Sequence, residues 1–397
     1  MIKDRSHHPI VVVGAGPGGS WAARTAAEKG VPVLLLEKRK VIGYPVRCAE
    51  GMTKSMFAEI GITPKEEWIS NTITGARIIS PSGHAVLVDS SHKNEICGWV
   101  LNREVFDSEL AIMAAQSGAT VHAGTGVVSI KKRADGWELS LIHTGKRISI
   151  TADVIIAADG FESQVGRWAG LETLVPFKDM MTCLEYTLEG VKGDHRTMDF
   201  FFDHNFCPGG YAWVFWKGPK KANVGMGISG ARLGNRGTVQ KHLESFISSK
   251  PDLACGERVR VIAGGIPTSK PLKCTVGHRI LLIGDAARVT DPLHGGGITN
   301  AMITGDIAGR CAAQFIQNGK DDAYLKRYDK EWRMRLERSL YLHYMIKEYI
   351  GNLNNDQIDI IIEALSHAKL DSLEPSTLIK HVEIIYPQIA DKIPQLV

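Results

Sequence analysis

A glycine-rich turn between two apolar segments near the start of this 397-residue chain constrains the fold more than any other feature. Residues 10–13 form the first apolar segment, and an alanine-rich stretch leads to the second at residues 33–36. Between them lies the pattern G-x-G-x-x-G, formed by Gly14, Gly16 and Gly19. The order predicts a buried strand, a tight turn, a helix and a parallel strand, which together make one βαβ unit.

The predicted βαβ unit has the chemistry of a dinucleotide site. Gly14 permits the tight turn, Gly16 lets the backbone approach a pyrophosphate, and Gly19 allows close packing of helix on strand. The helix start offers free N–H groups to phosphate. Glu37 ends the second strand, where its carboxylate can accept hydrogen bonds from ribose hydroxyls. The motif alone does not separate FAD from NAD, and a glycine-rich turn in an ordinary α/β core is the alternative.

Composition excludes several other classes of protein. Hydrophobic residues make up 44% of the chain, enough for a large core and two or three structural units. A net charge of +4, without a long basic run or zinc-finger spacing, argues against a nucleic-acid binder. The seven cysteines are scattered without a C-x-x-C pair, so we expect no metal site and no disulfides, as in a reducing cytoplasm. No apolar stretch reaches the roughly 18–20 residues of a membrane span, and from its polar character we expect the N-terminus not to be a signal peptide.

Two later segments again have the pattern of a buried strand that is followed by an acidic residue. A buried strand over residues 154–158 ends at Asp159, and another over 280–283 leads to Asp285. Three consecutive glycines then precede a predicted helix over residues 298–316. Acidic residues and glycines at the carboxyl ends of parallel strands lie where α/β proteins bind ligands, so these segments predict further parts of the same site.

The middle of the chain differs from these segments in its hydrophobic pattern. Residues 73–97 predict a hairpin, and residues 171–269 consist mainly of short alternating segments with a helix over 239–248. We therefore expect an antiparallel sheet inserted into the first domain. The stretch 207–218, C-P-G-G-Y-A-W-V-F-W-K-G, is strongly aromatic. Its rings either pack in the core or form the wall of a pocket for an apolar ligand.

Three segments in this order resemble the FAD fingerprints of glutathione-reductase-type flavoproteins, in the para-hydroxybenzoate hydroxylase branch. They are the glycine turn with Glu37, the sequence A-D-G-F-E-S-Q-V-G-R around Asp159, and I-G-D-A-A-R-V-T-D-P-L-H-G-G-G-I around Asp285. Two further stretches, V-R-C-A-E-G with Cys48 and P-G-G-Y-A-W-V-F, resemble the geranylgeranyl reductases. Within that family the chain is most similar to the archaeal digeranylgeranylglycerophospholipid reductases.

The resemblance implies an α/β fold with a discontinuous Rossmann-type FAD-binding domain, an inserted antiparallel-sheet substrate domain and a C-terminal helical region. In this helical region, residues 321–350 predict one long helix, which we expect to dock on the protein rather than lie on a membrane. The predicted boundaries are residues 1–72, 98–170 and 270–320 for the FAD-binding domain, 73–97 and 171–269 for the substrate domain, and 321–397 for the helical region.

The resemblance also implies the roles of individual residues. Those implied to act in catalysis are Cys48, near the flavin, and Tyr211 and Trp213, lining the substrate site. Those implied to bind FAD are Gly14, Gly16, Gly18, Gly19, Glu37, Cys48, Ala49, Gly51, Arg103, Val127, Asp159, Asp285, Gly296, Gly297 and Ile298. No residue is assigned as the proton donor.

The activity implied by the resemblance is FAD-dependent saturation of geranylgeranyl chains in archaeal-type ether lipid precursors, by a hydride from flavin N5 and a proton. The alternatives are a flavin monooxygenase of the same fold and a non-enzymatic prenyl-binding escort protein. The sequence predicts no second βαβ unit with a G-x-G-x-x-G turn for a nicotinamide cofactor, so either NAD(P)H visits transiently or a ferredoxin donates the electrons. We expect a cytoplasmic protein at the inner face of the membrane, with a prenylated lipid substrate and no nucleic-acid partner.

Overall fold

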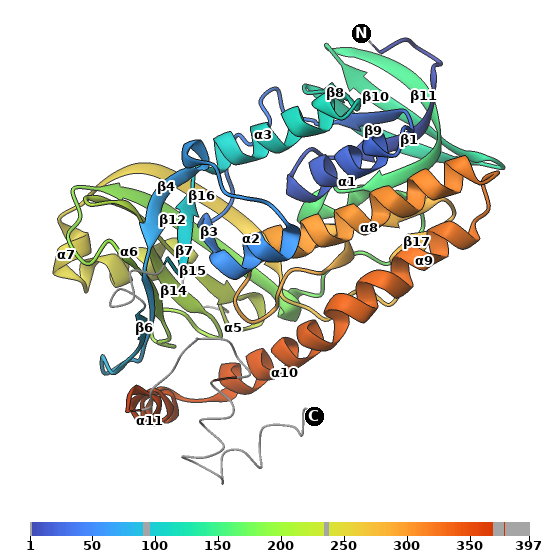
Figure 1. Ribbon diagram of the computed structural model, residues 1–397. Helices are drawn as coiled ribbons and strands as arrows, with labels where there is room; N and C mark the ends of the chain where they lie inside the picture. The colour runs from blue at the N-terminus through green and yellow to red at the C-terminus, as the bar shows by residue number, and fades with distance from the viewer. Residues whose placement is uncertain (1, 90–95, 234–237, 368–376, 378–397) are drawn as a thin grey trace. The chain divides into compact units, whose positions relative to one another are not determined.

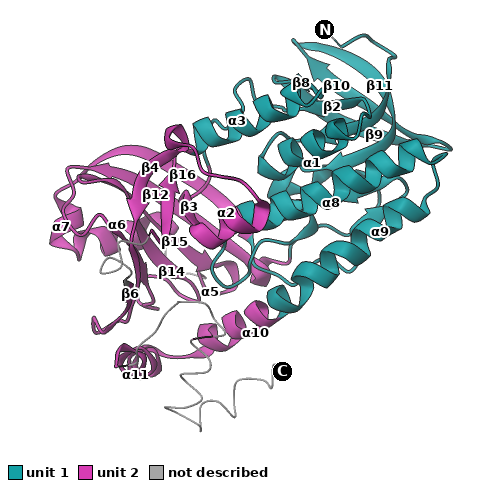
Figure 2. Ribbon diagram, in the orientation of Figure 1, with its two compact units in different colours: residues 1–46, 103–175, 267–341 teal, residues 47–102, 176–266, 342–397 magenta. Residues whose placement is uncertain are grey.

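The computed structural model describes residues 2–89, 96–233, 238–367 and 377 (Figure 1). The chain forms two compact units, each built from separate segments (Figure 2). Residues 47–72 and 98–102, which the sequence analysis grouped with the FAD-binding domain, lie in unit 2, where strand β3 (Gly51–Thr53) pairs with β7 (Gly98–Leu101). Unit 1 comprises Met1–Val46, Arg103–Val175 and Pro267–Tyr341, and unit 2 comprises Arg47–Asn102, Pro176–Ile266 and Leu342–Val397.

Unit 1 is built on a sheet whose main path runs β17-β18-β11-β1-β2-β8, with β10 paired to β11 and β9 to β10. Strand β1 pairs in parallel with both β2 and β11, and its apolar end is fully buried, as expected for a strand covered on both faces. The strands are β1 (His7–Val13), β2 (Val33–Leu36), β8 (Thr120–His122), β9 (Thr125–Arg133), β10 (Gly136–His143), β11 (Lys146–Ala157), β17 (Val276–Gly277) and β18 (Ile280–Leu282).

Strand β11 joins two parts that the sequence pattern separates. Its first half pairs antiparallel with β10, and its second half pairs in parallel with β1 and β18. The polar-to-apolar change along this strand suggests two elements, because a half-exposed strand and a strand buried on both faces have different patterns. The chain continues through both without a break.

Helices α1 (Pro17–Glu28) and α8 (Ile298–Gln317) pack closely in unit 1. A Cβ atom on Gly305 would lie 2.3 Å from the carbonyl oxygen of Gly18, and one on Gly309 would lie 2.4 Å from that of Ala22. The two helices therefore approach backbone to backbone at these positions. The remaining helices of unit 1 are α3 (Arg103–Gln116), α4 (Gln164–Trp168) and α9 (Ala323–Trp332), with short turns at Gly160–Glu162 and Gly284–Ala287.

The predicted helix over residues 321–350 is present as α9, a π-helical turn at Arg333–Glu337 and α10 (Arg338–Asn352). Its first part is docked, because Tyr328 and Trp332 are fully buried. The Tyr328 hydroxyl donates to the carbonyl of Leu282, and Trp332 Nε1 donates to Thr275 Oγ1 at 2.9 Å. Within the described ranges, none of the helices has both the length and the apolar character needed to cross a membrane.

Unit 2 contains a larger and a smaller sheet. The larger one runs β16-β12-β15-β14-β13-β5-β6, and it includes the predicted hairpin as β5 and β6. The smaller one runs β3-β7-β4. The strands are β3 (Gly51–Thr53), β4 (Ile69–Ile73), β5 (Gly75–Ile79), β6 (Ala85–Asp89), β7 (Gly98–Leu101), β12 (Met180–Glu189), β13 (Thr197–Phe201), β14 (Tyr211–Gly218), β15 (Lys221–Ser229) and β16 (Glu257–Pro267).

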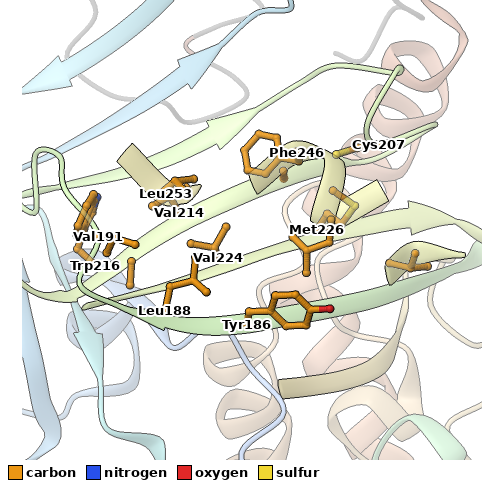
Figure 3. Packing of buried hydrophobic residues seen from close by; sticks show 14 of the residues in the cluster. Tyr186, Leu188, Val191, Cys207, Val214, Trp216, Val224, Met226, Phe246 and Leu253 are labelled. Atoms are coloured by element: carbon orange, nitrogen blue, oxygen red, sulfur yellow. The ribbon is translucent and has the colours of Figure 1, made fainter. Parts of the chain in front are cut away.

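One face of the larger sheet carries the main core of unit 2 (Figure 3). Val214, Val224 and Met226 point from the central strands toward Phe246 and Leu253 of α6 (Val239–Ser248) and α7 (Pro251–Ala254). Full burial of one such side chain stabilises the fold by roughly 1.5–3 kcal/mol. Further helical segments of unit 2 are α2 (Lys54–Ile60), α5 (Gly230–Leu233), most of α10, α11 (Asn355–Ser366) and short turns at Glu66–Trp68 and Phe177–Asp179.

Candidate functional site

The glycine turn of unit 1 combines close backbone packing with open space at one position. Gly14 has φ +104°, and a Cβ there would lie 2.3 Å from the carbonyl oxygen of Ala158. A Cβ on Gly19 would lie 1.9 Å from the carbonyl oxygen of Gly14, whereas one on Gly16 would meet nothing within 4 Å. The turn is therefore tightly packed against β11 and the start of α1, with open space beside Gly16. This is the division of roles that a pyrophosphate-binding turn needs.

Glu37 is tied to this turn. Its carboxylate accepts a hydrogen bond from the Ala15 amide and another from the Arg39 amide, both at 2.9 Å. The acid at the end of β2 thus fixes the backbone of the glycine turn. A carboxylate has about four acceptor positions, so Glu37 retains capacity for ribose hydroxyls.

Asp159 follows β11 and offers a second polar group to unit 1. Its Oδ2 accepts a hydrogen bond from the Val165 amide at 2.8 Å. Its Oδ1 is buried and has no hydrogen-bond partner among the described residues. Burial raises the pKa of Asp159, against the opposing effects of backbone hydrogen bonds and the charge of Lys38. A buried acceptor without a partner fits a missing polar ligand.

Asp285, Arg103 and the start of α8 form a third part of the same unit. Thr290 Oγ1 donates to Asp285 Oδ1 at 2.5 Å, and a Cβ on Gly297 would lie 3.4 Å from that same oxygen. Burial raises the pKa of Asp285, while Thr290 and the charge of Arg103 lower it. Arg103 itself is held by Asp107 through bonds of 2.7 and 2.8 Å. These contacts place an acid, a guanidinium and a helix N-terminus together.

The first turn of α8 holds another unsatisfied group. The Thr299 hydroxyl is buried and has no partner within the part of the chain that the structure describes. It lies next to Ile298, the first residue of α8, where backbone N–H groups are also unpaired by the helix. Gly296 contributes to the preceding loop, where its amide donates to His294 Nδ1 at 3.1 Å. Val127 lies on β9 opposite Leu141, and its role remains a prediction.

In unit 2, the loop with Cys48 is fastened to the larger sheet through Glu50. This residue is buried, with 2% exposure, and has φ +73°, a conformation that non-glycine residues rarely adopt. Its carboxylate forms an ion pair with Lys217 and accepts from Asn223 Nδ2 at 2.9 Å. The Glu50 amide donates to Cys48 Sγ at 3.2 Å. A Cβ on Gly51 would lie 2.9 Å from the ring of Phe215. The loop is therefore packed on the sheet.

Tyr211, Trp213 and Phe215 alternate along β14 and lie on the face of the larger sheet opposite the helix-covered core. Their cluster also includes Ala49 from the Cys48 loop and Phe200 from β13. The centroids of the Tyr211 and Trp213 rings are 6.0 Å apart, and those of Phe200 and Tyr211 are 5.8 Å apart. The structure thus gathers the Cys48 loop and the aromatic motif in one unit. We refer to this surface of the sheet as the aromatic face.

Sequence reasoning missed several polar groups of the aromatic face, among them Glu50, Glu185, Lys217 and Asn223. Glu185 is buried on β12, where its Oε2 accepts from Trp213 Nε1 at 2.7 Å. A signal was available, because Cys183, Glu185 and Thr187 alternate with apolar residues along a strand. Placing them beside Trp213 requires the register of three strands, which the sequence does not reveal.

Comparison with known proteins shows to which class and to which family of proteins this chain belongs. A model of an FAD binding domain matches residues 7–206, and one of the geranylgeranyl reductase catalytic domain matches residues 179–266. The chain is therefore a flavin-dependent oxidoreductase. It belongs to the digeranylgeranylglycerophospholipid reductase family, as the following likenesses show.

The chain is 38% identical over 394 residues to a digeranylgeranylglycerophospholipid reductase of Methanospirillum hungatei, covering 98% of this chain and 97% of that one. It is 39% identical over 381 residues to the enzyme of that name from Methanoculleus marisnigri, covering 95% of each. A geranylgeranyl bacteriochlorophyll reductase-like structure from Thermoplasma acidophilum has a TM-score of 0.95 and 34% identity, and covers 99% of this chain and 100% of its own.

These likenesses confirm the predicted fold class, the predicted family and FAD as the cofactor. The individual site residues remain predictions. The structure brings the FAD-directed residues Gly14, Gly16, Gly18, Gly19, Glu37, Arg103, Val127, Asp159, Asp285, Gly296, Gly297 and Ile298 into unit 1, and Cys48, Ala49, Gly51, Tyr211 and Trp213 into unit 2.

Proposed function

We propose that this chain uses FAD to saturate the double bonds of geranylgeranyl chains in archaeal-type ether lipid precursors. The observation that carries this proposal is the attachment of the Cys48 loop to the aromatic face of unit 2. The two stretches that resemble the geranylgeranyl reductases lie far apart in sequence, yet they form one packed cluster. The names of the relatives support the same substrate class.

Unit 1 is proposed to hold the cofactor. The open space at Gly16 suits the pyrophosphate, and Glu37 suits the ribose hydroxyls. Asp285 and the start of α8 would face the ribityl chain and the ring system, where the unpaired Thr299 hydroxyl is available to a polar group of the cofactor. Reduced FAD supplies a hydride from N5 to an alkene carbon.

The aromatic face is proposed to bind the prenyl chain. Tyr211 and Trp213 would contact the chain, orient one double bond and keep water away from it. Their π systems would also stabilise positive charge that develops on a substituted alkene carbon. Cys48 would lie beside the flavin, at a position that Glu50 fixes through its contacts with the sheet.

The reaction is tested with purified FAD-loaded protein reduced by dithionite without oxygen. Addition of a geranylgeranyl ether lipid should reoxidise the flavin, and the product should gain two mass units for each double bond reduced. The Cys48→Ala variant should slow this step, whereas Cys255→Ala, at an exposed cysteine of the same unit, should not. Flavin that stays reduced with lipid and reoxidises only in air would favour a monooxygenase instead.

The electron donor and the place of action are also proposals. NAD(P)H or a reduced ferredoxin would reduce the flavin, and mixing each donor with oxidised protein under anaerobic conditions distinguishes them by the rate of flavin bleaching. Because the proposed substrate chains are those of membrane lipids, the protein would work at the inner face of the membrane. Co-sedimentation with vesicles of anionic lipid, compared with vesicles of neutral lipid, tests this contact.

A further inference from the structure

A buried carboxyl group on the aromatic face has no assigned task. Glu185 lies on β12 with 3% exposure. One of its oxygens, Oε2, accepts a hydrogen bond from Trp213 Nε1 at 2.7 Å. The other, Oε1, is buried and lacks a hydrogen-bond partner among the described residues. Most buried carboxyl oxygens in proteins are paired, so this one requires an explanation.

The position of Glu185 follows from the register of three strands. Trp213 on β14 is opposite Gly225 on β15, and Gly225 is opposite Glu185 on β12. A Cβ on Gly225 would lie 2.5 Å from the Trp213 ring and 2.9 Å from the Cβ of Glu185. The bare backbone at Gly225 therefore lets the indole cross β15 and reach the carboxyl group. In the next residue pair of β12 and β15 that faces the same side, Thr187 lies opposite Asn223, and Thr187 Oγ1 donates to Asn223 Oδ1 at 2.9 Å.

The electrostatic surroundings favour a neutral carboxylic acid. The pKa of Glu185 is raised to about 8: burial and the charge of Glu50 raise it, while the hydrogen bond from Trp213 and the charges of Lys217 and Arg260 act in the opposite direction. Within the described residues Glu185 has no ion pair, since Lys217 pairs with Glu50. Cys183, two residues away, has a pKa raised to about 12 by burial and by Glu185, so it stays a neutral thiol.

We propose that Glu185 is the acid that delivers the proton to the substrate double bond, an inference that rests on the proposed reductase function. Saturation breaks one carbon–carbon π bond and forms two C–H bonds. The electron pair arrives as hydride from reduced FAD at one carbon, and the proton leaves the Glu185 carboxyl group for the other. The flavin is oxidised, the alkene is reduced, and the resulting carboxylate regains its proton from water.

The Trp213 contact gives this residue a defined geometry for the task. The indole N–H occupies Oε2 and leaves Oε1 to carry the proton. When the proton has gone, the same N–H bond stabilises the carboxylate that remains. A donor whose pKa lies near the working pH combines a protonated ground state with proton release in the transition state. Trp213 is thus a positioning residue for the acid as well as part of the aromatic face.

Three substitutions on β12 separate a catalytic acid from a structural one. Glu185→Gln keeps the acceptor for Trp213 but removes the acidic proton, and Glu185→Asp retains an acid on a shorter side chain. Glu189→Gln is the matched control, because Glu189 lies on the same strand at an exposed position, paired with Lys221. All three variants are loaded with FAD and checked for unchanged flavin content before use.

The first measurement needs no turnover. Infrared difference spectra of the oxidised FAD-loaded protein should show one carboxylic acid carbonyl band that disappears with an apparent pKa near 8. The band should persist in Glu189→Gln and be absent in Glu185→Gln. A Glu185 carboxyl group that is already ionised at pH 6 would overturn the proposal, because it would hold no proton to donate.

The second measurement follows reoxidation of dithionite-reduced flavin by a geranylgeranyl ether lipid. Glu185→Gln should slow this step on the order of 10²-fold to 10⁴-fold, and Glu185→Asp should restore part of the rate. The wild-type rate should fall as pH rises through 8, because the acid form is lost, and the Gln variant should lack this fall.

The outcomes distinguish the two proposals. If Glu185→Gln reoxidises as fast as wild type, another group donates the proton and only the assignment of Glu185 fails. If lipid fails to reoxidise the wild-type flavin, the reductase function itself fails, and the assignment with it.

Discussion

The two faces of the larger sheet in unit 2 share the same strands but differ in chemistry. On the helix-covered face, apolar side chains such as Val214, Val224 and Met226 pack against α6 and α7 (Figure 3). On the aromatic face, rings alternate with buried polar groups, including Glu185 and Asn223. The first arrangement contributes free energy of folding through burial, whereas buried polar groups contribute little net stability even when they are paired. We therefore expect the faces to respond differently to substitution.

The largest expected effect is on the helix-covered face. Phe246→Ala should lower the free energy of unfolding by about 3–5 kcal/mol, because it opens a cavity at a residue that is 1% exposed. Urea unfolding of the FAD-loaded protein measures this change. Phe177→Ala is the control, since that ring is 63% exposed and its removal should cost less than about 0.5 kcal/mol. Equal costs for the two variants would contradict the assignment of the core.

A buried ion pair on the aromatic face should come next. Lys217→Met leaves the Glu50 carboxylate without its cation and should cost about 3 kcal/mol, with loss of lipid-dependent flavin reoxidation because the Cys48 loop is released. Lys220→Met, at an exposed lysine of the adjoining turn, should have little effect. Adding Glu50→Gln to Lys217→Met should recover part of the stability. Full activity in Lys217→Met would show that the ion pair does not position the loop.

A smaller cost in stability is expected at Gly225. In Gly225→Ala the new methyl group meets the Trp213 ring, and we expect a loss of about 1–3 kcal/mol together with a change in tryptophan fluorescence. Gly264→Ala on β16 is the matched control, because a Cβ there would meet nothing within 4 Å. An unchanged Trp213 environment in Gly225→Ala would argue against the close approach of the indole to Glu185.

The smallest effect should come from the Tyr211 hydroxyl. If Tyr211 acts through its ring, Tyr211→Phe should change the stability by less than about 1 kcal/mol and the reoxidation rate by less than about threefold, because the packing with Phe200 and Trp213 is kept. Tyr211→Ala should slow the reaction more. If Tyr211→Phe abolished turnover, the phenol rather than Glu185 would be the better candidate for the proton donor.

The sequence predicts the aromatic side chains of the larger sheet better than the buried polar groups beside them. The alternation along β14 identifies the strand and the shared side of Tyr211, Trp213 and Phe215, because side chains in a strand alternate with period two. The glycine turn and Glu37 are likewise recognisable, since all their parts lie within one local βαβ unit. Local patterns therefore predict the FAD-binding fold and the aromatic motif.

The polar part of the aromatic face depends on contacts between distant segments. Glu50 and Lys217 are 167 positions apart, and the row from Trp213 to Glu185 depends on the register of three strands. A shift of one residue between β12 and β15 would turn Glu185 toward the helix-covered core, and one between β14 and β15 would turn Trp213 away from it. Periodicity within a single segment contains no information about such pairings, so the position of the acid beside Trp213 could not be predicted.

The left-handed backbone at Glu50 has a consequence for protein engineering. A glycine would adopt this conformation without cost, but it would lack the carboxylate that binds Lys217 and Asn223. The position of the sequence C-A-E-G therefore depends on Lys217 of β14 and Asn223 of β15. A graft of this loop onto another flavoprotein would transfer the cysteine without its position, unless the lysine and the asparagine were transplanted with it.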